Sequence, residues 1–204
     1  MNKFHHYFIF CLLGIAGGLL GAFIFDIIPP SQDRLIAGFY ETETAVMVSP
    51  HGLRKKIMEG KKDFVLVDVR SKEEYEKEHV IGAVNIPAYK DRETSAYGDV
   101  ERIVNSFSSL IEENPDKEII VYCYSMPCMT GRKVGHMLAD HNIFVKELGV
   151  GWNEWRYYWE LWNHEHELAT TRAEDYIYSG SEPGVYIPNP SEIAPCSIEN
   201  EFGC

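Results

Sequence analysis

Phe64-Val65-Leu66-Val67-Asp68-Val69-Arg70 is the stretch that decides the fold. Its first four residues form a continuous apolar run without polar alternation, which is typical of a strand buried on both faces of a parallel sheet. The run Ile119-Ile120-Val121-Tyr122 repeats this pattern. Between the two runs, Ser71 and Glu74 form a capping box and residues 98–113 show helical periodicity. Strands that alternate with helices predict an α/β domain with a central, mainly parallel sheet flanked by helices.

The same alternation extends toward both ends of the chain. Ser49-Pro50 offers an N-cap and a first-turn proline for a helix that ends by Gly60. We expect further strands at 84–87 and 144–145 and further helices at 132–140 and 152–162. The expected domain is residues 49–163, with a connector at 31–48 and an acidic, proline-containing tail at 164–204 that reads as an extended or disordered arm.

Cys123 directly follows the second buried run. Ligands of open α/β sheets bind at the carboxyl ends of the strands, so this cysteine stands where chemistry is usually found. Cys128 follows five residues later. Two cysteines so close in one loop can form a disulfide, or the second can resolve a persulfide on the first.

Four motifs give the chain a resemblance to the rhodanese family. Residues 67–75 and 79–87 are similar to the amino-terminal signature, residues 121–123 to the strand that ends in the active cysteine, and residues 148–155 to the closing signature. The resemblance covers about residues 50–163 and implies a sulfurtransferase. In that chemistry the Cys123 thiolate attacks a sulfane sulfur, as in thiosulfate, holds it as a persulfide and passes it to a thiol or another nucleophile.

The resemblance also implies the residues of the site. Amides of the loop and the N-terminus of the following helix would favour the thiolate, and Arg132 and Lys133 would add positive potential for an anionic donor. Asp68, Arg70, His79 and Gly82 are expected to be structural. The expected substrate-binding residues lie in the loop and the first part of the helix: Tyr124, Ser125, Met126, Pro127, Met129, Thr130, Gly131 and Arg132.

Two departures from the family pattern bear on function. The loop reads as about two residues longer than usual, with Cys128 at the place where an arginine is often found, and Val150 replaces one glycine of the closing pair. A phosphatase would need an arginine six positions after Cys123, and Met129 stands there. Three alternatives remain: a sulfurtransferase, a thiol–disulfide redox protein that uses Cys123 with Cys128, and an inactive rhodanese fold that serves as a binding module.

Composition excludes several other classes. The 204 residues carry a formal net charge of −12, which argues against nucleic acid as a partner. Five cysteines are too few for a disulfide scaffold, although Cys196 and Cys204 could pair outside the cytoplasm. The run His164-Glu165-His166-Glu167 could attract a metal, but alternation of this kind at a fraying helix end is usually solvated. No cofactor and no metal are expected, and the partners would be a small sulfur-containing anion or a thiol, including a protein thiol.

The N-terminal thirty residues predict a membrane anchor. Tyr7 to Phe25 is uncharged and strongly apolar, and Pro29 follows. A span of residues 7–28 is favoured over a cleaved signal peptide, whose apolar region is shorter. Lys3 precedes the run and acidic residues follow it, which predicts a cytoplasmic N-terminus and an extracytoplasmic domain. The spacings Gly14/Gly18 and Gly17/Gly21 would permit a weak homodimer through this helix.

Overall fold

The computed structural model describes residues 3–27, 29–91, 93–94, 98–168 and 171–188. The chain divides into two compact units, Met1–Glu43 and Thr44–Cys204. Helix α1 (Lys3–Ile27) lies in the first unit, and helix α2 (Gln32–Val46) runs from the first unit into the second. Within the described residues, no helix is both long enough and apolar enough to cross a membrane, so the predicted transmembrane helix finds no support there.

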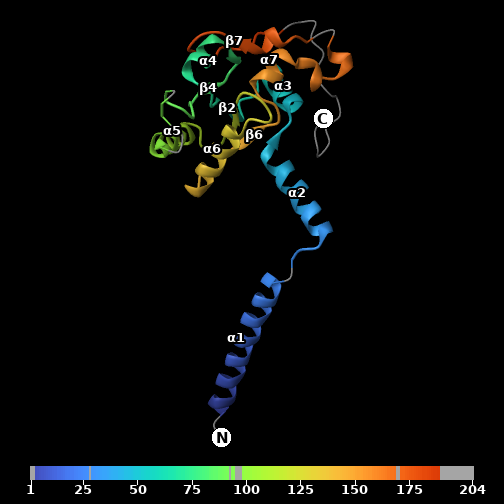
Figure 1. Ribbon diagram of the computed structural model, residues 1–204, viewed down its shortest axis with the longest axis vertical. Helices are drawn as coiled ribbons and strands as arrows, with labels where there is room; N and C mark the ends of the chain where they lie inside the picture. Colours follow the sequence, from blue (N-terminus) through green and yellow to red (C-terminus); the bar gives the residue numbers. More distant parts are fainter. Residues whose placement is uncertain (1–2, 28, 92, 95–97, 169–170, 189–204) are drawn as a thin grey trace. The chain divides into compact units, whose positions relative to one another are not determined.

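A five-stranded parallel sheet forms the centre of the second unit, as predicted (Figure 1). The strand order is β1-β6-β5-β2-β4, and every pair in this sheet is parallel. The strands are β1 (Met47–Val48), β2 (Phe64–Asp68), β4 (Val84–Asn85), β5 (Glu118–Tyr122) and β6 (Lys146–Leu148). The two apolar runs that decide the fold, β2 and β5, are neighbours in the middle, with Leu66 in register with Ile120.

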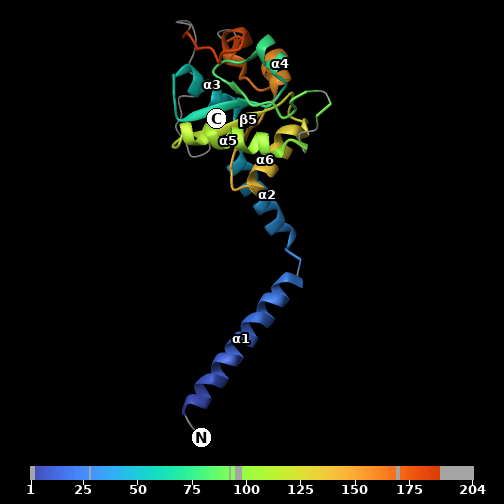
Figure 2. The same ribbon diagram turned by 90° about the vertical axis from the view of Figure 1, so that its left-hand side faces the viewer.

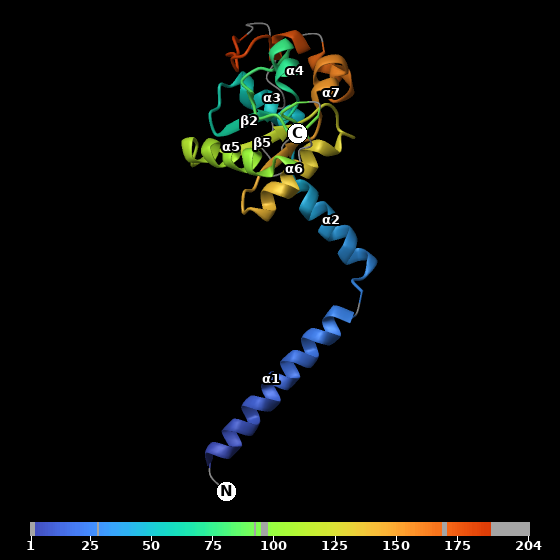
Figure 3. The ribbon, with the colours of Figure 1, turned by 60° about the vertical axis from the view of Figure 1, so that its left-hand side comes forward.

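Helices cover both faces of this sheet, which explains why its central strands lack polar alternation. Leu66 and Ile120 pack with α3 (Pro50–Met58), α4 (Lys72–Lys77) and α7 (Trp152–Tyr157) on one face. Val67 and Val121 pack with α5 (Val100–Glu113) and α6 (Met129–Asp140) on the other. Figures 2 and 3 show α5 and α6 together on one side of the sheet. Each core therefore receives alternate residues of the same strands.

Two of the predicted helix starts, those of α3 and α4, are confirmed with their caps. The Ser49 hydroxyl accepts a hydrogen bond from the Gly52 N–H at 3.3 Å, and Pro50 occupies the first turn of α3. The Ser71 hydroxyl accepts from the Glu74 N–H and donates to the Glu74 carboxylate, which begins α4. These caps satisfy backbone groups that a helix leaves without partners at its N-terminus.

Three predicted elements differ from the structure. The connector at 31–48 is α2 followed by β1, and the strand expected at 144–145 is instead Lys146–Leu148. The prediction followed the apolar residues Phe144 and Val145, but Phe144 is 75% exposed. The strand begins two residues later, at Lys146, and its residues Lys146 and Glu147 form ion pairs with charged neighbours. The helix expected to reach residue 162 ends at Tyr157 and is followed by a 3₁₀ turn, Trp159–Leu161.

The prediction of an extended or disordered arm is wrong for much of the segment after residue 164. Two 3₁₀ turns, Glu165–Glu167 and Ala173–Tyr176, lead into strand β7 (Ile177–Tyr178). This strand pairs antiparallel with β3 (His79–Val80), and the Tyr176 side chain is fully buried. Sparse aromatic residues thus attach a polar segment to the domain. Residues 189–204, with Cys196 and Cys204, lie outside the described part of the chain.

Candidate active-site loop

Two cysteines face each other at the carboxyl end of the central sheet. Cys123 follows the last residue of β5 and is 5% exposed, and Cys128 is the half-buried N-cap of α6. Their Sγ atoms lie 2.7 Å apart and share a hydrogen bond. A disulfide bond length is about 2.05 Å, so both are free thiols within a short movement of bonding.

The loop from Cys123 to the following helix is shorter than predicted. Helix α6 begins at Met129 and not at Arg132, which leaves Tyr124 to Cys128 as the loop. Gly131, which was expected to bind substrate, is the buried third residue of this helix. A Cβ at this position would stand 3.2 Å from Glu147 Oε1 and 3.8 Å from Cys123 Cβ. The glycine therefore lets the helix approach β6 and the cysteine closely.

The two sulfurs differ in their ionisation. Burial raises the pKa of Cys123 to about 12, and its hydrogen bond to Cys128 acts in the same direction. Burial alone would raise the pKa of Cys128, but the hydrogen bonds from Cys123 and from the N–H and hydroxyl of Thr130 bring it below its ordinary value. Cys128 therefore loses its proton at lower pH than Cys123, so the first negative charge on the reduced pair forms on Cys128.

The start of α7 holds the loop in place. The Trp152 N–H donates to the Cys123 carbonyl at 2.8 Å, and the Asn153 N–H donates to the Tyr124 carbonyl at 2.7 Å. Glu154 Oε2 accepts from the Gly151 N–H at 2.9 Å and from the Met126 N–H at 3.1 Å. The carboxylate thus joins the tip of the loop to the N-terminus of α7.

Gly151 is required by this contact. A Cβ at residue 151 would stand 2.2 Å from the Ser125 nitrogen, which is closer than real Cβ atoms come to heavy atoms of residues that are not their chain neighbours. The Val150 side chain, by contrast, is buried in the core. Of the closing motif, Gly151 is the position that requires a glycine, because the backbone of the loop between the two cysteines lies directly against it.

A buried ion pair supports the floor of the site. Asp68 Oδ2 lies 2.6 Å from the Arg70 guanidinium and accepts the Tyr122 hydroxyl at 2.7 Å. The guanidinium also lies 4.4 Å from the Trp152 ring centroid. Both charged side chains are nearly inaccessible. These contacts stabilise the ends of β2 and β5, on which Cys123 stands.

The other two residues expected to be structural lie away from the sulfurs. His79 is fully buried, stacks on Tyr75 at 3.8 Å and contacts the Tyr75 carbonyl through Nδ1 at 2.7 Å. Gly82 has a φ of 83°, in the left-handed region that favours glycine, and its N–H donates to the Pro183 carbonyl.

The predicted substrate-binding residues divide into two groups. Three large side chains of the loop and the first helical turn, Tyr124, Met126 and Met129, are 40–54% exposed, and Pro127 is also exposed. The remaining ones serve the loop itself: the Ser125 carbonyl accepts from the Cys128 N–H at 2.9 Å, and Thr130 donates to the sulfurs. The Tyr124 hydroxyl donates to the Glu74 carboxylate.

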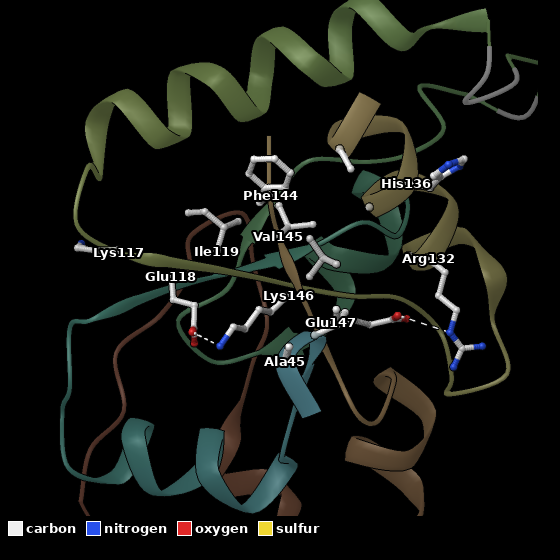
Figure 4. Close-up of a pocket in the computed structure, with 15 residues that line it drawn as sticks. Ala45, Lys117, Glu118, Ile119, Arg132, His136, Phe144, Val145, Lys146 and Glu147 are labelled. Carbon is white, nitrogen blue, oxygen red and sulfur yellow. Dashed lines mark ion pairs between the residues drawn. The ribbon is translucent and has the colours of Figure 1, made fainter. Parts of the chain in front are cut away.

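The Arg132 side chain pairs with a carboxylate of β6. Its Nε lies 3.5 Å from Glu147 Oε2, at one end of a cavity of about 520 Å³ between α6 and strands β5 and β6 (Figure 4). Burial raises the pKa of Glu147, although Arg132 acts against it. The cavity floor is largely apolar, and Lys146 and Glu118 pair at 2.6 Å across another part of it. The Arg132 guanidinium is thus engaged by the Glu147 carboxylate.

The rhodanese-like domain profile matches residues 49–157, more than half of the chain. The chain belongs to this family. An HTH-type transcriptional regulator of Mycobacterium tuberculosis is 32% identical over 94 residues, which are 46% of this chain and 35% of the regulator. The chain therefore matches about a third of that regulator's length.

Solved structures include similar domains. The BH2092 protein of Bacillus halodurans is 26% identical, with a TM-score of 0.48 over 61% of this chain and 81% of that one. A thiosulfate sulfurtransferase of Pseudomonas aeruginosa is 20% identical, with a TM-score of 0.41 over 54% of this chain and 18% of that one.

Sequence reasoning missed two residues that shape this rhodanese-like site, Glu154 and Glu147. Glu154 could have been found, because an acidic residue three positions after a helix start is a capping signature. Glu147 gave no comparable signal. It lies on a short strand whose position was predicted wrongly, and its approach to Gly131 depends on the pairing of β6 with β5.

Proposed function

We propose that this chain is a two-cysteine sulfurtransferase in which Cys123 takes up sulfane sulfur and Cys128 releases it. The observation that carries the proposal is the 2.7 Å between the two Sγ atoms at the carboxyl end of β5. A persulfide on Cys123 would place its inner sulfur beside a second cysteine that is already in reach. Membership of the rhodanese-like family supports the sulfur chemistry.

The first step uses the existing hydrogen bond. As Cys123 Sγ attacks the outer sulfur of a donor such as thiosulfate, its proton passes to the Cys128 thiolate. A new sulfur–sulfur bond forms on Cys123, the donor's sulfur–sulfur bond breaks, and sulfite leaves with the electron pair. The N–H of Tyr124 and the hydroxyl of Thr130 hydrogen-bond Cys123, which stabilises negative charge on its sulfur.

The second step consumes the persulfide in one of two ways. An external thiol can attack the outer sulfur and carry it away, which regenerates Cys123. Alternatively, Cys128 Sγ attacks Cys123 Sγ and passes the proton it took up in the first step to the outer sulfur, so that a Cys123–Cys128 disulfide forms, the persulfide bond breaks and hydrosulfide leaves. An external dithiol then reduces the disulfide. The short separation of the sulfurs favours the second route.

A thiol–disulfide redox function is the second candidate. Cys128 is the more exposed sulfur, and its pKa is lowered, as in the attacking thiol of a redox pair. Such a protein would exchange with disulfides and release no sulfide from thiosulfate. The inactive binding module is the third possibility, and it would do neither.

Steady-state turnover separates these functions. With thiosulfate and dithiothreitol, the sulfurtransferase should release sulfite and sulfide in equal amounts. Cys123→Ser should abolish both products. Without dithiothreitol, so that no external thiol acts as the acceptor, Cys128→Ser should release sulfite once per chain and no sulfide. Wild-type protein that produces neither product from any sulfane donor would refute the proposal.

A further proposal concerns location and rests on the sequence. We propose that residues 7–28 anchor the chain in a membrane with the rhodanese-like domain on the extracytoplasmic side. The uncharged apolar run and the flanking charges support this orientation. A reporter fused after Arg34 should lie outside the cytoplasm, so an enzyme that is active only there should be active in the fusion. A fusion that places the reporter in the cytoplasm would contradict the proposed orientation.

A further inference from the structure

A buried carboxylate meets two imidazoles on the side of the domain away from the cysteines' helix α6. His51 lies in the first turn of α3, while His164 and Glu167 belong to the segment that follows α7. His51 and Glu167 are 116 residues apart in the sequence, so only the fold brings them together. The run 164–167 reads as a solvated end when its sequence is taken alone.

We propose that His51, His164 and Glu167 form a binding site for a divalent cation of the zinc type. One ligand atom of each residue lies within 4.8 Å of those of the other two. His51 Nε2 is 3.0 Å from Glu167 Oε2, and the His51 and His164 ring centroids are 4.2 Å apart. This site is independent of the proposed sulfur chemistry.

These separations are close to what zinc requires. Zinc binds imidazole nitrogen and carboxylate oxygen at about 2.1 Å, which places the ligands of a tetrahedral ion about 3.4 Å from one another. His51 and Glu167 are already nearer than this, and a rotation of the exposed His164 ring closes the remaining distance. The ion would replace the hydrogen bond between His51 and Glu167.

Neighbouring groups orient the side chains of His51 and Glu167. His51 Nε2 contacts Glu167 Oε2, which orients the imidazole toward the carboxylate. The Arg54 guanidinium lies 2.8 Å from Glu167 Oε1, and both side chains are fully buried. This cation opposes a second positive charge, but it also fixes the carboxylate with Oε2 toward His51. The His164 N–H donates to the same Oε2 at 3.3 Å.

The exposure of the three residues gives the ion an entry path. His51 is 5% exposed and Glu167 is fully buried, whereas His164 is exposed. Three protein ligands with one side open to solvent leave room for a water as the fourth ligand. A bound ion would fasten the segment after residue 164 to α3, and it should therefore stabilise the attachment of the C-terminal turns and β7.

Zinc binding by the full-length chain without an affinity tag tests the proposal. The thiols are first alkylated with iodoacetamide so that they do not compete, and zinc chloride is added in equilibrium dialysis. We expect one zinc ion per chain. His164→Ala should weaken binding by at least about tenfold, since the loss of an outer-shell partner alone costs that much. His141→Ala, which removes an exposed histidine at the end of α6, should change nothing.

Thermal unfolding gives a second readout that does not depend on counting ions. At one zinc concentration, the ion should raise the Tm of the wild type and of His141→Ala, and it should raise the Tm of His164→Ala less, because that variant binds zinc more weakly. His164 is exposed, so its substitution leaves the folded core intact. The proposal is overturned if the wild type binds no zinc, or if His164→Ala binds zinc as tightly as the wild type does.

Discussion

The Glu154 carboxylate accepts a hydrogen bond from the Met126 N–H, and this bond connects the tip of the cysteine loop to the first turn of α7. The same oxygen accepts from the Gly151 N–H. The loop that carries both sulfurs is therefore held by an element that lies about thirty residues later in the sequence.

Glu154→Ala should loosen the loop without unfolding the domain. Two hydrogen bonds to a charged acceptor are lost, and the free energy of unfolding should fall by about 1–3 kcal/mol. Urea denaturation measures the stability, and the alkylation rate of Cys123 measures the loop, because a looser loop exposes this buried thiol. Glu160→Ala is the matched control, since this carboxylate is exposed. Equal alkylation rates in Glu154→Ala and the wild type would contradict the proposed clamp.

Gly151→Ala should displace the loop by direct collision. The new Cβ would stand 2.2 Å from the Ser125 nitrogen, and backbone has to move to relieve the contact. We expect a loss of about 1–3 kcal/mol or more. Gly135→Ala is the control within α6, where the added Cβ would meet Val145 at an ordinary 3.7 Å. That change should stabilise the protein by about 0.5–1 kcal/mol. Comparable destabilisation by both variants would show that the close contact is not the cause.

Asp68→Asn should be among the most destabilising single changes in the domain. It keeps the shape of the side chain but leaves the buried Arg70 without its counter-charge, which costs about 3–5 kcal/mol. Asp63→Asn is the control. It also removes a carboxylate that forms an ion pair, at 3.0 Å from Lys56, but the Asp63 side chain is 57% exposed. Its effect should stay within about 1 kcal/mol. Urea denaturation compares the two, and equal losses would contradict the role given to burial.

The ionisation of Cys128 predicts a pH dependence with a definite sign. Only the thiolate reacts with iodoacetamide, so the rate at Cys128 should rise with pH to a plateau, with its midpoint below the pKa of an ordinary thiol. Cys123→Ala removes the S–H donor that favours the charged form, so the midpoint should move to higher pH. Peptide mass spectrometry separates Cys128 from the other cysteines. A midpoint that stays in place would exclude the shared proton.

The central architecture could be predicted because it depends on local patterns. The apolar runs of β2 and β5 specify burial on both faces, and the caps at Ser49 and Ser71 specify where helices begin. The elements that were predicted wrongly depend on pairing between segments that are distant in the sequence. β7 is two residues long and exists because it pairs with β3, which no local pattern reports.

The site divides in the same way. The position of Cys123 could be predicted from the end of β5. The proximity of Cys128 could be predicted because it follows five residues later in the same loop. The contacts of Glu154 with the loop and of Glu147 with Gly131 arise only when α7 and β6 are placed beside the loop. The burial of Glu167 beside His51 and Arg54 is the extreme case, because the run 164–167 looks fully solvated without α3.

Intact-mass analysis of the reduced protein, treated with one equivalent of thiosulfate and no reductant, tests the central claim most directly. We predict that the wild type loses two hydrogens, as the Cys123–Cys128 disulfide forms, and releases one sulfide per chain. Cys128→Ser should instead gain one sulfur atom, and Cys123→Ser should stay unchanged. A persistent sulfur adduct on the wild type, with no disulfide and no sulfide, would contradict the two-cysteine mechanism.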